Sequence, residues 1–159
     1  MKITIICVGK IKEKYFTMAI DEYRKRLSRY CKLEIVELQD EKTPDGAGAL
    51  IEKQIKEKEG TRILSAIRSD SYVISLAIEG KKMDSVSFAN VIEQSGVNGI
   101  SHLTFVIGGS LGLDSRVLKQ SDMLLSFSDM TFPHQLMRVI LLEQIYRGYR
   151  IINGEPYHK

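Results

Sequence analysis

The last three residues of the chain bring together side chains that could take part in chemistry. Tyr157, His158 and Lys159 carry a phenol, an imidazole and an ammonium group. An aromatic ring can stack on a base, a neutral imidazole can accept a proton, and an ammonium group can stabilise a phosphate or a developing anion. The alternative is a mobile tail without a chemical role, as is usual for chain termini. As a set, the three residues are candidates for proton transfer or RNA contact.

Two further segments follow hydrophobic runs and could hold a small ligand through their backbone. Gly108 and Gly109 come directly after residues 103–107, and glycine lets the backbone approach a ligand closely. Residues 127–132 mix small, polar and apolar side chains, which suits an adenine held by backbone hydrogen bonds and apolar contact. A plain tight turn would also explain the glycines, and Thr131 could simply cap the next helix. The glycine spacing is not the G-x-G-x-x-G pattern of dinucleotide-binding folds, and no G-x-x-x-x-G-K-[ST] motif for nucleoside triphosphates is present.

The last hydrophobic segment carries basic residues of two kinds. Arg138 falls within an apolar stripe, where a guanidinium needs a carboxylate, a backbone group or a ligand as its partner. It is therefore a candidate site residue, with a structural salt bridge as the alternative. Arg147 and Arg150 lie on the polar side and are candidates for RNA binding, although Glu143 can pair with Arg147 within the helix. His134 stands beside the possible ligand segment, where RNA contact and a structural role are both open.

Elements of regular structure must position these candidates. Short apolar, β-branched runs predict strands, and apolar residues at three- and four-residue spacing predict helices. We expect strands over residues 3–8, 72–78, 103–107 and 123–127, and an edge strand around 33–35, where apolar and polar residues alternate. The strand over 72–78 is expected to end in the turn Glu79-Gly80. Helices are expected over about 16–30 and 51–67, from Asp84 or Ser85, from about Asp114, and from Pro133. This alternation predicts an α/β fold in one domain over residues 1–159, a parallel sheet with helices on both faces. Ligands bind beyond the carboxyl ends of such strands.

The last helix is apolar on two sides. Leu142, Ile145, Tyr149 and Ile152 form one stripe, and Leu136, Ile140 and Ile151 lie roughly opposite. A helix that is apolar on two sides is buried on two sides, and in a small protein the second partner is often another subunit. The sequence therefore predicts a homodimer.

Composition narrows the class of protein. Among the 159 residues, 43% are hydrophobic and 27% are charged, which is typical of a soluble globular protein. No apolar run is long enough to span a membrane, and the strand directly after Met1 leaves no room for a secretory leader, so a cytoplasmic location is expected. Cys7 and Cys31 are expected to be reduced packing residues. His102 is expected to contact only solvent.

Charge is unevenly distributed along the chain. Residues 10–32 carry eight basic and three acidic side chains, whereas residues 33–132 carry ten basic and fifteen acidic ones. Residues 133–159 carry four basic and two acidic side chains. Basic ends around an acidic middle fit a polyanion that touches the ends, and an ordinary solvated helix face is the alternative.

Several motifs together resemble those of the RlmH family, bacterial ribosomal RNA large-subunit methyltransferases of the SPOUT class. The resemblance covers essentially the whole chain, and the length and the order of the motifs agree. The matching motifs are Met-Lys-Ile at the start with Val8-Gly9-Lys10, Val-Ile-Gly-Gly-Ser over 106–110 with Gly112-Leu113, Ser-Phe-Ser-Asp-Met-Thr-Phe-Pro-His over 126–134, Arg138-Val139, Glu-Gln-Ile-Tyr-Arg over 143–147, and Pro-Tyr-His-Lys over 156–159.

The resemblance implies more than the residue pattern does. SPOUT enzymes have a Rossmann-like sheet whose C-terminal segment forms a trefoil knot, an exception to the rule against threaded loops. They use S-adenosylmethionine (SAM), need no metal, and in this family pack as antiparallel homodimers. By position, SAM would contact Leu76, Gly108, Phe127, Ser128, Asp129, Met130, Thr131 and Phe132, where Asp129 occupies a variable place and would contribute a backbone contact. The family methylates N3 of pseudouridine 1915 in helix 69 of 23S rRNA, within the assembled ribosome.

The methyl group on a sulfonium is already activated, so such an enzyme mainly aligns the attack and helps to remove the N3 proton. His158 could accept that proton, while Lys159, Arg138 or Arg147 could stabilise the developing anion or a phosphate, and Tyr157 could stack on the base. We expect the tail of one protomer to close over the cofactor of the other. Two other classes compete with this reading: a Rossmann-like nucleotide-binding enzyme and a non-catalytic, ribosome-binding dimeric module.

Overall fold

A five-stranded parallel sheet forms the centre of the molecule. The computed structural model describes residues 1–159. The strands are β1 (Lys2–Val8), β2 (Lys32–Leu38), β3 (Tyr72–Lys82), β4 (His102–Ile107) and β5 (Met123–Ser126). They lie in the order β2-β1-β4-β3-β5, and every neighbouring pair is parallel. The predicted α/β class is confirmed.

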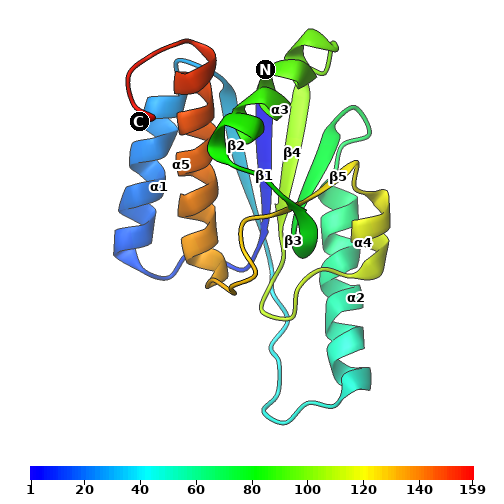
Figure 1. Ribbon diagram of the computed structural model, residues 1–159. Coiled ribbons are helices and arrows are strands. Elements are labelled where there is room, and N and C mark those ends of the chain that lie inside the picture. Colours follow the sequence, from blue (N-terminus) through cyan, green and yellow to red (C-terminus); the bar gives the residue numbers. More distant parts are fainter.

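Helices cover both faces of this sheet, as expected (Figure 1). They are α1 (Lys14–Leu27), α2 (Ala49–Ala66), α3 (Ser85–Val97), α4 (Ser115–Gln120) and α5 (His134–Ile152). Helix α5 packs between α1 and α3 on one face, whereas α2 and α4 lie on the other. None of the five is both long enough and apolar enough to cross a lipid bilayer.

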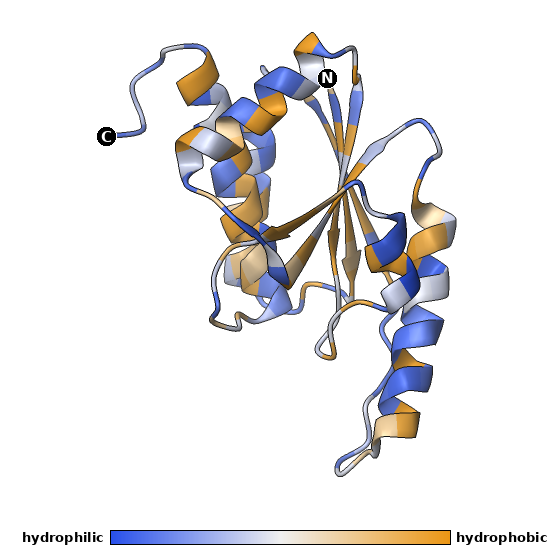
Figure 2. Cartoon of the chain, turned by 45° about the vertical axis from the view of Figure 1, so that its right-hand side comes forward, coloured by the Kyte–Doolittle hydropathy of each residue, from blue (hydrophilic) through white to orange (hydrophobic).

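Each sheet face has its own hydrophobic core because side chains alternate along a strand. On β1, Ile3, Ile5 and Cys7 pack under α1, α3 and α5, while Ile6 and Val8 pack under α2 and α4. Hydrophobic residues accordingly run along the strands, whereas the projecting part of α2 is mostly hydrophilic (Figure 2). Strand β4 is buried along its whole length, which is the pattern of a central strand in a parallel sheet.

Most helix starts agree with the sequence. The Asp84 carboxylate accepts a hydrogen bond from the Ser87 N–H at 2.7 Å, and Asp114 caps α4 through the Arg116 N–H. Helix α5 differs by one residue: Pro133 is the N-cap, and His134 is the first helical residue. Because proline carries no side-chain acceptor, this helix start has no side-chain cap, and Thr131 does not supply one.

Two expectations from the sequence are wrong. Strand β3 does not end at Glu79-Gly80 but continues to Lys82 after an interruption in its pairing. His102 does not merely contact solvent: it is 4% exposed, and its Nε2 lies 2.9 Å from the Thr4 hydroxyl on β1. It is buried because its strand, β4, is central. Cys7 and Cys31 are free, as expected, and burial raises the pKa of the Cys7 thiol to about 12.

Candidate functional site

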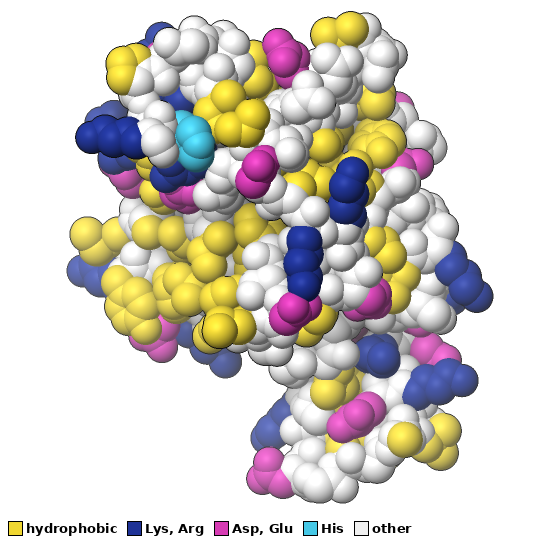
Figure 3. Space-filling view, viewed as in Figure 1, with side chains coloured by type: hydrophobic (Ala, Val, Ile, Leu, Met, Phe, Trp, Pro, Cys, Tyr) yellow, Lys and Arg dark blue, Asp and Glu magenta, His cyan; other side chains and the backbone are white.

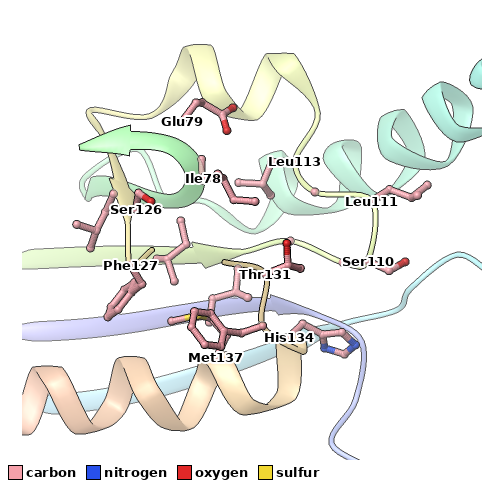
Figure 4. A pocket seen from close by; sticks show the side chains of 18 of the residues that line it. Ile78, Glu79, Ser110, Leu111, Leu113, Ser126, Phe127, Thr131, His134 and Met137 are labelled. Carbon is pink, nitrogen blue, oxygen red and sulfur yellow. The ribbon is translucent and has the colours of Figure 1, made fainter. Parts of the chain in front are cut away.

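A cavity lies at the carboxyl-end edge of the sheet, beside β3, β4 and β5. Its volume is about 820 Å³, within the usual range for small-molecule sites. Three strand-end segments form its walls, and the first turn of α5 closes another side (Figure 4). Half of its 24 lining residues are hydrophobic. This is the edge of the sheet at which the strand order predicts a ligand site.

An irregularity in β3 shapes the first wall. Leu76 and Lys81 both pair with Leu125 of β5, so the residues between them leave the sheet. The displaced residues include Ile78 and Glu79, which line the cavity. Gly80 brings the chain back against β5: a Cβ there would lie 2.7 Å from the Leu124 carbonyl carbon. Only glycine fits such a close approach of two backbones.

The glycine turn after β4 forms the second wall. The Gly112 N–H donates to the Gly109 carbonyl at 3.1 Å, and Gly112 has a φ of +86°. A Cβ on Gly108 would lie 2.9 Å from the Leu113 side chain and 3.1 Å from the backbone of Gly112. The turn therefore brings bare backbone to the cavity, as both the tight-turn and the ligand-binding interpretations require.

The third wall, residues 127–132, has backbone groups that the protein itself does not use. No N–H or carbonyl group in this segment takes part in a backbone–backbone hydrogen bond. Its internal bonds involve serine side chains: the Ser126 hydroxyl donates to the Ser128 carbonyl at 3.1 Å, and the Ser128 hydroxyl accepts from the Met130 N–H at 3.0 Å. Such a segment can offer both donors and acceptors to a flat heterocycle.

His134 stands at the rim of the cavity, on the first turn of α5 (Figure 4). Its ring packs on Gly9, where a Cβ would lie 3.1 Å from the imidazole Cε1. The Nδ1 atom is buried and has no hydrogen-bond partner. Burial, followed by the positive charge of Arg138, lowers the pKa of His134, so its imidazole is held neutral.

The structure brings most of the predicted cofactor residues together. Those that line the cavity are Leu76, Gly108, Phe127, Ser128, Met130, Thr131 and Phe132. His134, a candidate for RNA contact, also lines it. Asp129 is the exception, because its carboxylate turns away and pairs with the Lys82 ammonium at 2.5 Å. No group of three or more His, Cys, Asp or Glu side chains converges where a metal ion could bind.

Several lining residues have no counterpart among the sequence candidates. Ile78 and Met137 face the cavity from β3 and α5, with Thr131 between them (Figure 4). Lys56 reaches the cavity from α2 and makes no salt bridge. The Glu79-Gly80 pair was a usable signal for the β3 irregularity, but no local pattern marks Lys56, whose position depends on how α2 packs.

Arg138 lies outside this cavity. Its side chain is 1% exposed, and its guanidinium donates to the Glu37 carboxylate at 2.7 Å and to the Gly9 carbonyl at 2.6 Å. Glu37 also accepts from the Ile11 N–H at 3.0 Å. These contacts join β2, the end of β1 and α5. The geometry is that of the structural salt bridge, which was the alternative to a site role.

The tail residues gather on α5, away from their own cavity. The Tyr157 hydroxyl donates to Glu143 at 3.1 Å, and the Arg147 guanidinium lies 4.7 Å over the Tyr157 ring. Arg147 pairs with Glu143 and lies 3.2 Å from Nδ1 of His158. Arg147 follows His134 by 13 positions, about 20 Å along the helix at 1.5 Å per residue. Tyr157, His158 and Arg147 therefore form one cluster, remote from the cavity of the same chain.

Arg150 has a different environment. It pairs with Glu155, donates to the Tyr30 hydroxyl at 3.1 Å and donates to the Pro156 carbonyl at 2.9 Å. These bonds hold the tail against the end of α1. Lys159, the last residue, is exposed and makes no salt bridge.

Comparison with known proteins agrees with this geometry. A family model described as "Predicted SPOUT methyltransferase" matches residues 1–158. The chain is 63% identical to ribosomal RNA large subunit methyltransferase H of Clostridium tetani and 64% identical to the protein of that name from Bifidobacterium adolescentis. The corresponding Clostridium perfringens protein is 61% identical. Each alignment spans 159 residues and covers all of both chains. The chain belongs to the SPOUT methyltransferase family and groups there with the ribosomal RNA large subunit methyltransferase H proteins.

Proposed function

We propose that this protein transfers a methyl group from SAM to N3 of pseudouridine 1915 in helix 69 of 23S rRNA, within the assembled ribosome. The observation that carries the proposal is a cavity bounded by unused backbone groups, in a chain that aligns over its full length with proteins named for methylating large-subunit ribosomal RNA. The reaction takes place in the cytoplasm, where ribosomes are assembled, and the whole chain acts as one domain.

The cavity suits SAM in shape and chemistry. An adenine ring needs donors and acceptors along its edge and apolar contact on its faces. Residues 127–132 supply free backbone groups for the edge, and Leu76 and Met137 supply apolar surface. Gly80 lets the β3 segment lie against β5, and Gly108 lets the turn after β4 close on Leu113 and Gly112, because a Cβ at either position would meet other atoms within 3 Å. When bound, SAM supplies an activated methyl group on a sulfonium, and the chain needs no metal for that step.

The residues of the protein have to position the base and deal with its N3 proton. His158 accepts that proton, Tyr157 stacks on the base, and Lys159 and Arg147 stabilise negative charge on the base or a phosphate. Arg138 acts indirectly, by holding the start of α5 against the end of β1. His134, neutral at the rim of the cavity, contacts the RNA.

The remoteness of the tail from its own cavity supports a dimeric site. Tyr15 and Met18 on α1 are 63% and 64% exposed, and Leu136, Val139 and Ile140 on α5 are half-buried. Figure 3 shows this apolar area at the left of the molecule, below the basic side chains. A second copy packed antiparallel over it would bury these residues and carry its own tail toward the cavity of the first. We therefore infer a homodimer in which each tail completes the site of the partner.

The fold also supports a trefoil knot. The backbone of Gly80 lies against Leu124 and Leu125, and the chain then runs from β5 past the cavity to His134, beside Gly9. The displaced residues of β3 and the loop that follows β4 line the same cavity as this crossing segment. We infer that the C-terminal segment passes through the loop that they form.

Methyl transfer to ribosomes tests the proposal directly. Radiolabelled SAM is supplied with ribosomes purified from cells that lack this enzyme, and in parallel with free 23S rRNA. We expect label at the helix 69 pseudouridine of intact ribosomes and little on free RNA. A folded protein that binds SAM but labels neither would refute the substrate. Binding of NAD rather than SAM, measured side by side by calorimetry, would refute the methyl donor as well.

A further inference from the structure

A basic hollow lies at the opposite end of the sheet from the cavity. It is lined by Met1 at the start of β1, by Lys32 and Leu33 at the start of β2, and by residues that end α1 or follow it; these are Arg24, Ser28, Arg29, Tyr30 and Cys31. Its volume is about 640 Å³. Three of its eight lining residues are cationic, the α-amino group of Met1 adds a fourth positive charge, and none of the eight is acidic.

Neighbouring carboxylates neutralise these charges only in part. Neither Arg24 nor Lys32 makes a salt bridge, and the only carboxylate near Arg29 is Glu155, at 3.9 Å. Glu155 is already engaged by Arg150 and by the Tyr30 hydroxyl. An ordinary solvated face carries mixed charges, as Lys2 and Glu34 do nearby at 2.8 Å. The hollow is instead a local excess of positive charge.

A helix-dipole explanation covers only part of this cluster. Cations in the last turn of a helix stabilise its carbonyl end, which accounts for Arg24. It does not account for Lys32, which starts a strand, or for the α-amino group of Met1. Three separate segments of the chain therefore bring positive charge to one concave surface. Concave cationic surfaces with exposed donors fit the phosphodiester groups of a nucleic acid.

The floor of the hollow is held rigidly. The Tyr30 ring stacks on Tyr149 with ring centroids 5.4 Å apart, and the Arg29 guanidinium lies 5.0 Å from the Tyr30 centroid. The Tyr30 hydroxyl is bonded to both Glu155 and Arg150. Because Glu155 directly precedes Pro156-Tyr157, the hollow and the proposed catalytic tail are parts of one braced unit.

In an antiparallel dimer the hollow of one protomer would lie near the cavity of its partner. Helix α5 is 19 residues long, about 28 Å, and the hollow lies beside its C-terminal end while the cavity lies beside its N-terminal end. Antiparallel packing would place the hollow of one protomer next to the cavity of the other. We propose that Arg24, Arg29, Lys32 and the Met1 amino group bind the phosphodiester backbone of ribosomal RNA and hold the substrate loop over the partner's cavity. This inference rests on the proposed function.

Salt dependence of ribosome binding tests the hollow. The triple variant Arg24→Gln, Arg29→Gln, Lys32→Gln removes three charges, and Lys53→Gln, Lys58→Gln, Lys119→Gln is its control, since these exposed lysines lie on α2 and α4. Affinity for ribosomes that lack the modification is measured between about 50 and 200 mM salt. Each phosphate contact contributes roughly 0.7 to 0.9 to the slope of log K against log salt. We expect the slope of the hollow variant to fall by about 2 to 3 and its affinity at 100 mM salt to fall about tenfold or more.

The control variant should keep a slope close to that of the wild type. In the transfer assay the hollow variant should show a raised KM for ribosomes and unchanged affinity for SAM, because it leaves the cavity intact. Equal slopes for the hollow and control variants, with wild-type ribosome binding present, would overturn the inference alone. Absence of ribosome binding and methyl transfer in the wild type would overturn the proposed function with it. If the hollow variant loses binding to anionic phospholipid vesicles but binds ribosomes as the wild type does, the hollow binds a membrane surface. That result would also overturn the inference that it binds RNA.

Discussion

The buried ion pair between Arg138 and Glu37 leads to a prediction about which partner matters more for stability. Arg138 is 1% exposed, whereas the Glu37 side chain is 37% exposed on the edge strand β2. Replacing Glu37 by Leu leaves a buried guanidinium without its carboxylate. Breaking a buried pair in this way costs about 3 to 5 kcal/mol, and partial access of water to Glu37 places the value near 3 kcal/mol.

Replacing Arg138 by Met should cost less, although it removes the more deeply buried residue. Met fills similar volume and carries no charge, and the Glu37 carboxylate that remains can reach water. The variant loses the hydrogen bonds to Glu37 and to the Gly9 carbonyl, but it no longer has to bury a charged guanidinium. The net loss of folding free energy should be about 1 to 2 kcal/mol. The double variant should show a coupling of about 1 to 3 kcal/mol, because the two residues are in direct contact.

Urea unfolding at one fixed protein concentration measures these free energies, since the apparent stability of the proposed dimer would depend on concentration. With an m-value of about 2 kcal/mol/M, Glu37→Leu should lower the midpoint by about 1.5 M and Arg138→Met by less than 1 M. SAM affinity of the folded Arg138→Met protein should stay near that of the wild type. If Arg138→Met keeps the wild-type midpoint but loses methyl transfer, the structural role argued for Arg138 is wrong and a catalytic one is right.

Three other perturbations have outcomes that follow from the structure. Gly80→Ala forces a Cβ to 2.7 Å from the β5 backbone, so calorimetry should show at least tenfold weaker SAM binding. Gly96→Ala is the control, because its Cβ meets nothing closer than 3.9 Å. It should leave SAM binding unchanged and stabilise α3 by about 0.5 to 1 kcal/mol. Burial, followed by the Lys2 charge, lowers the pKa of His102 from its ordinary 6.5, so the unfolded chain takes up a proton that the folded chain refuses. Stability should therefore be complete above about pH 6.5 and fall as the pH drops below it. Unfolding midpoints measured from pH 8 to 5 should fall less in His102→Gln than in the wild type. Identical pH profiles for the two proteins would show that His102 is not the cause of this loss of stability. Deletion of residues 157–159 should abolish methyl transfer but leave a dimer in analytical ultracentrifugation, whereas near-normal turnover would remove the tail from the mechanism.

Local patterns in the sequence predicted most of the elements. The β-branched run of β1 and the capping residues Asp84 and Asp114 each act over a few neighbouring positions, so their effects can be read without knowing the fold. The edge position of β2 also followed from its alternating polarity, which the sheet order confirms. The sequence motifs supplied the family, and the cofactor residues carried over from it line one cavity, with the exception of Asp129.

Tertiary structure decided the rest, because those features depend on residues far apart in the chain. The partner of Arg138 is 101 positions away, and nothing near Arg138 distinguishes a salt bridge from a ligand contact. The interruption of β3 exists because β5 pairs on both sides of it, so the Glu79-Gly80 pair alone suggested the end of a strand. His102 is buried only because β4 occupies the middle of the sheet. Residue type and short-range spacing determine which elements form and what chemistry they could support, whereas the order of strands and the packing of helices determine which of those groups meet.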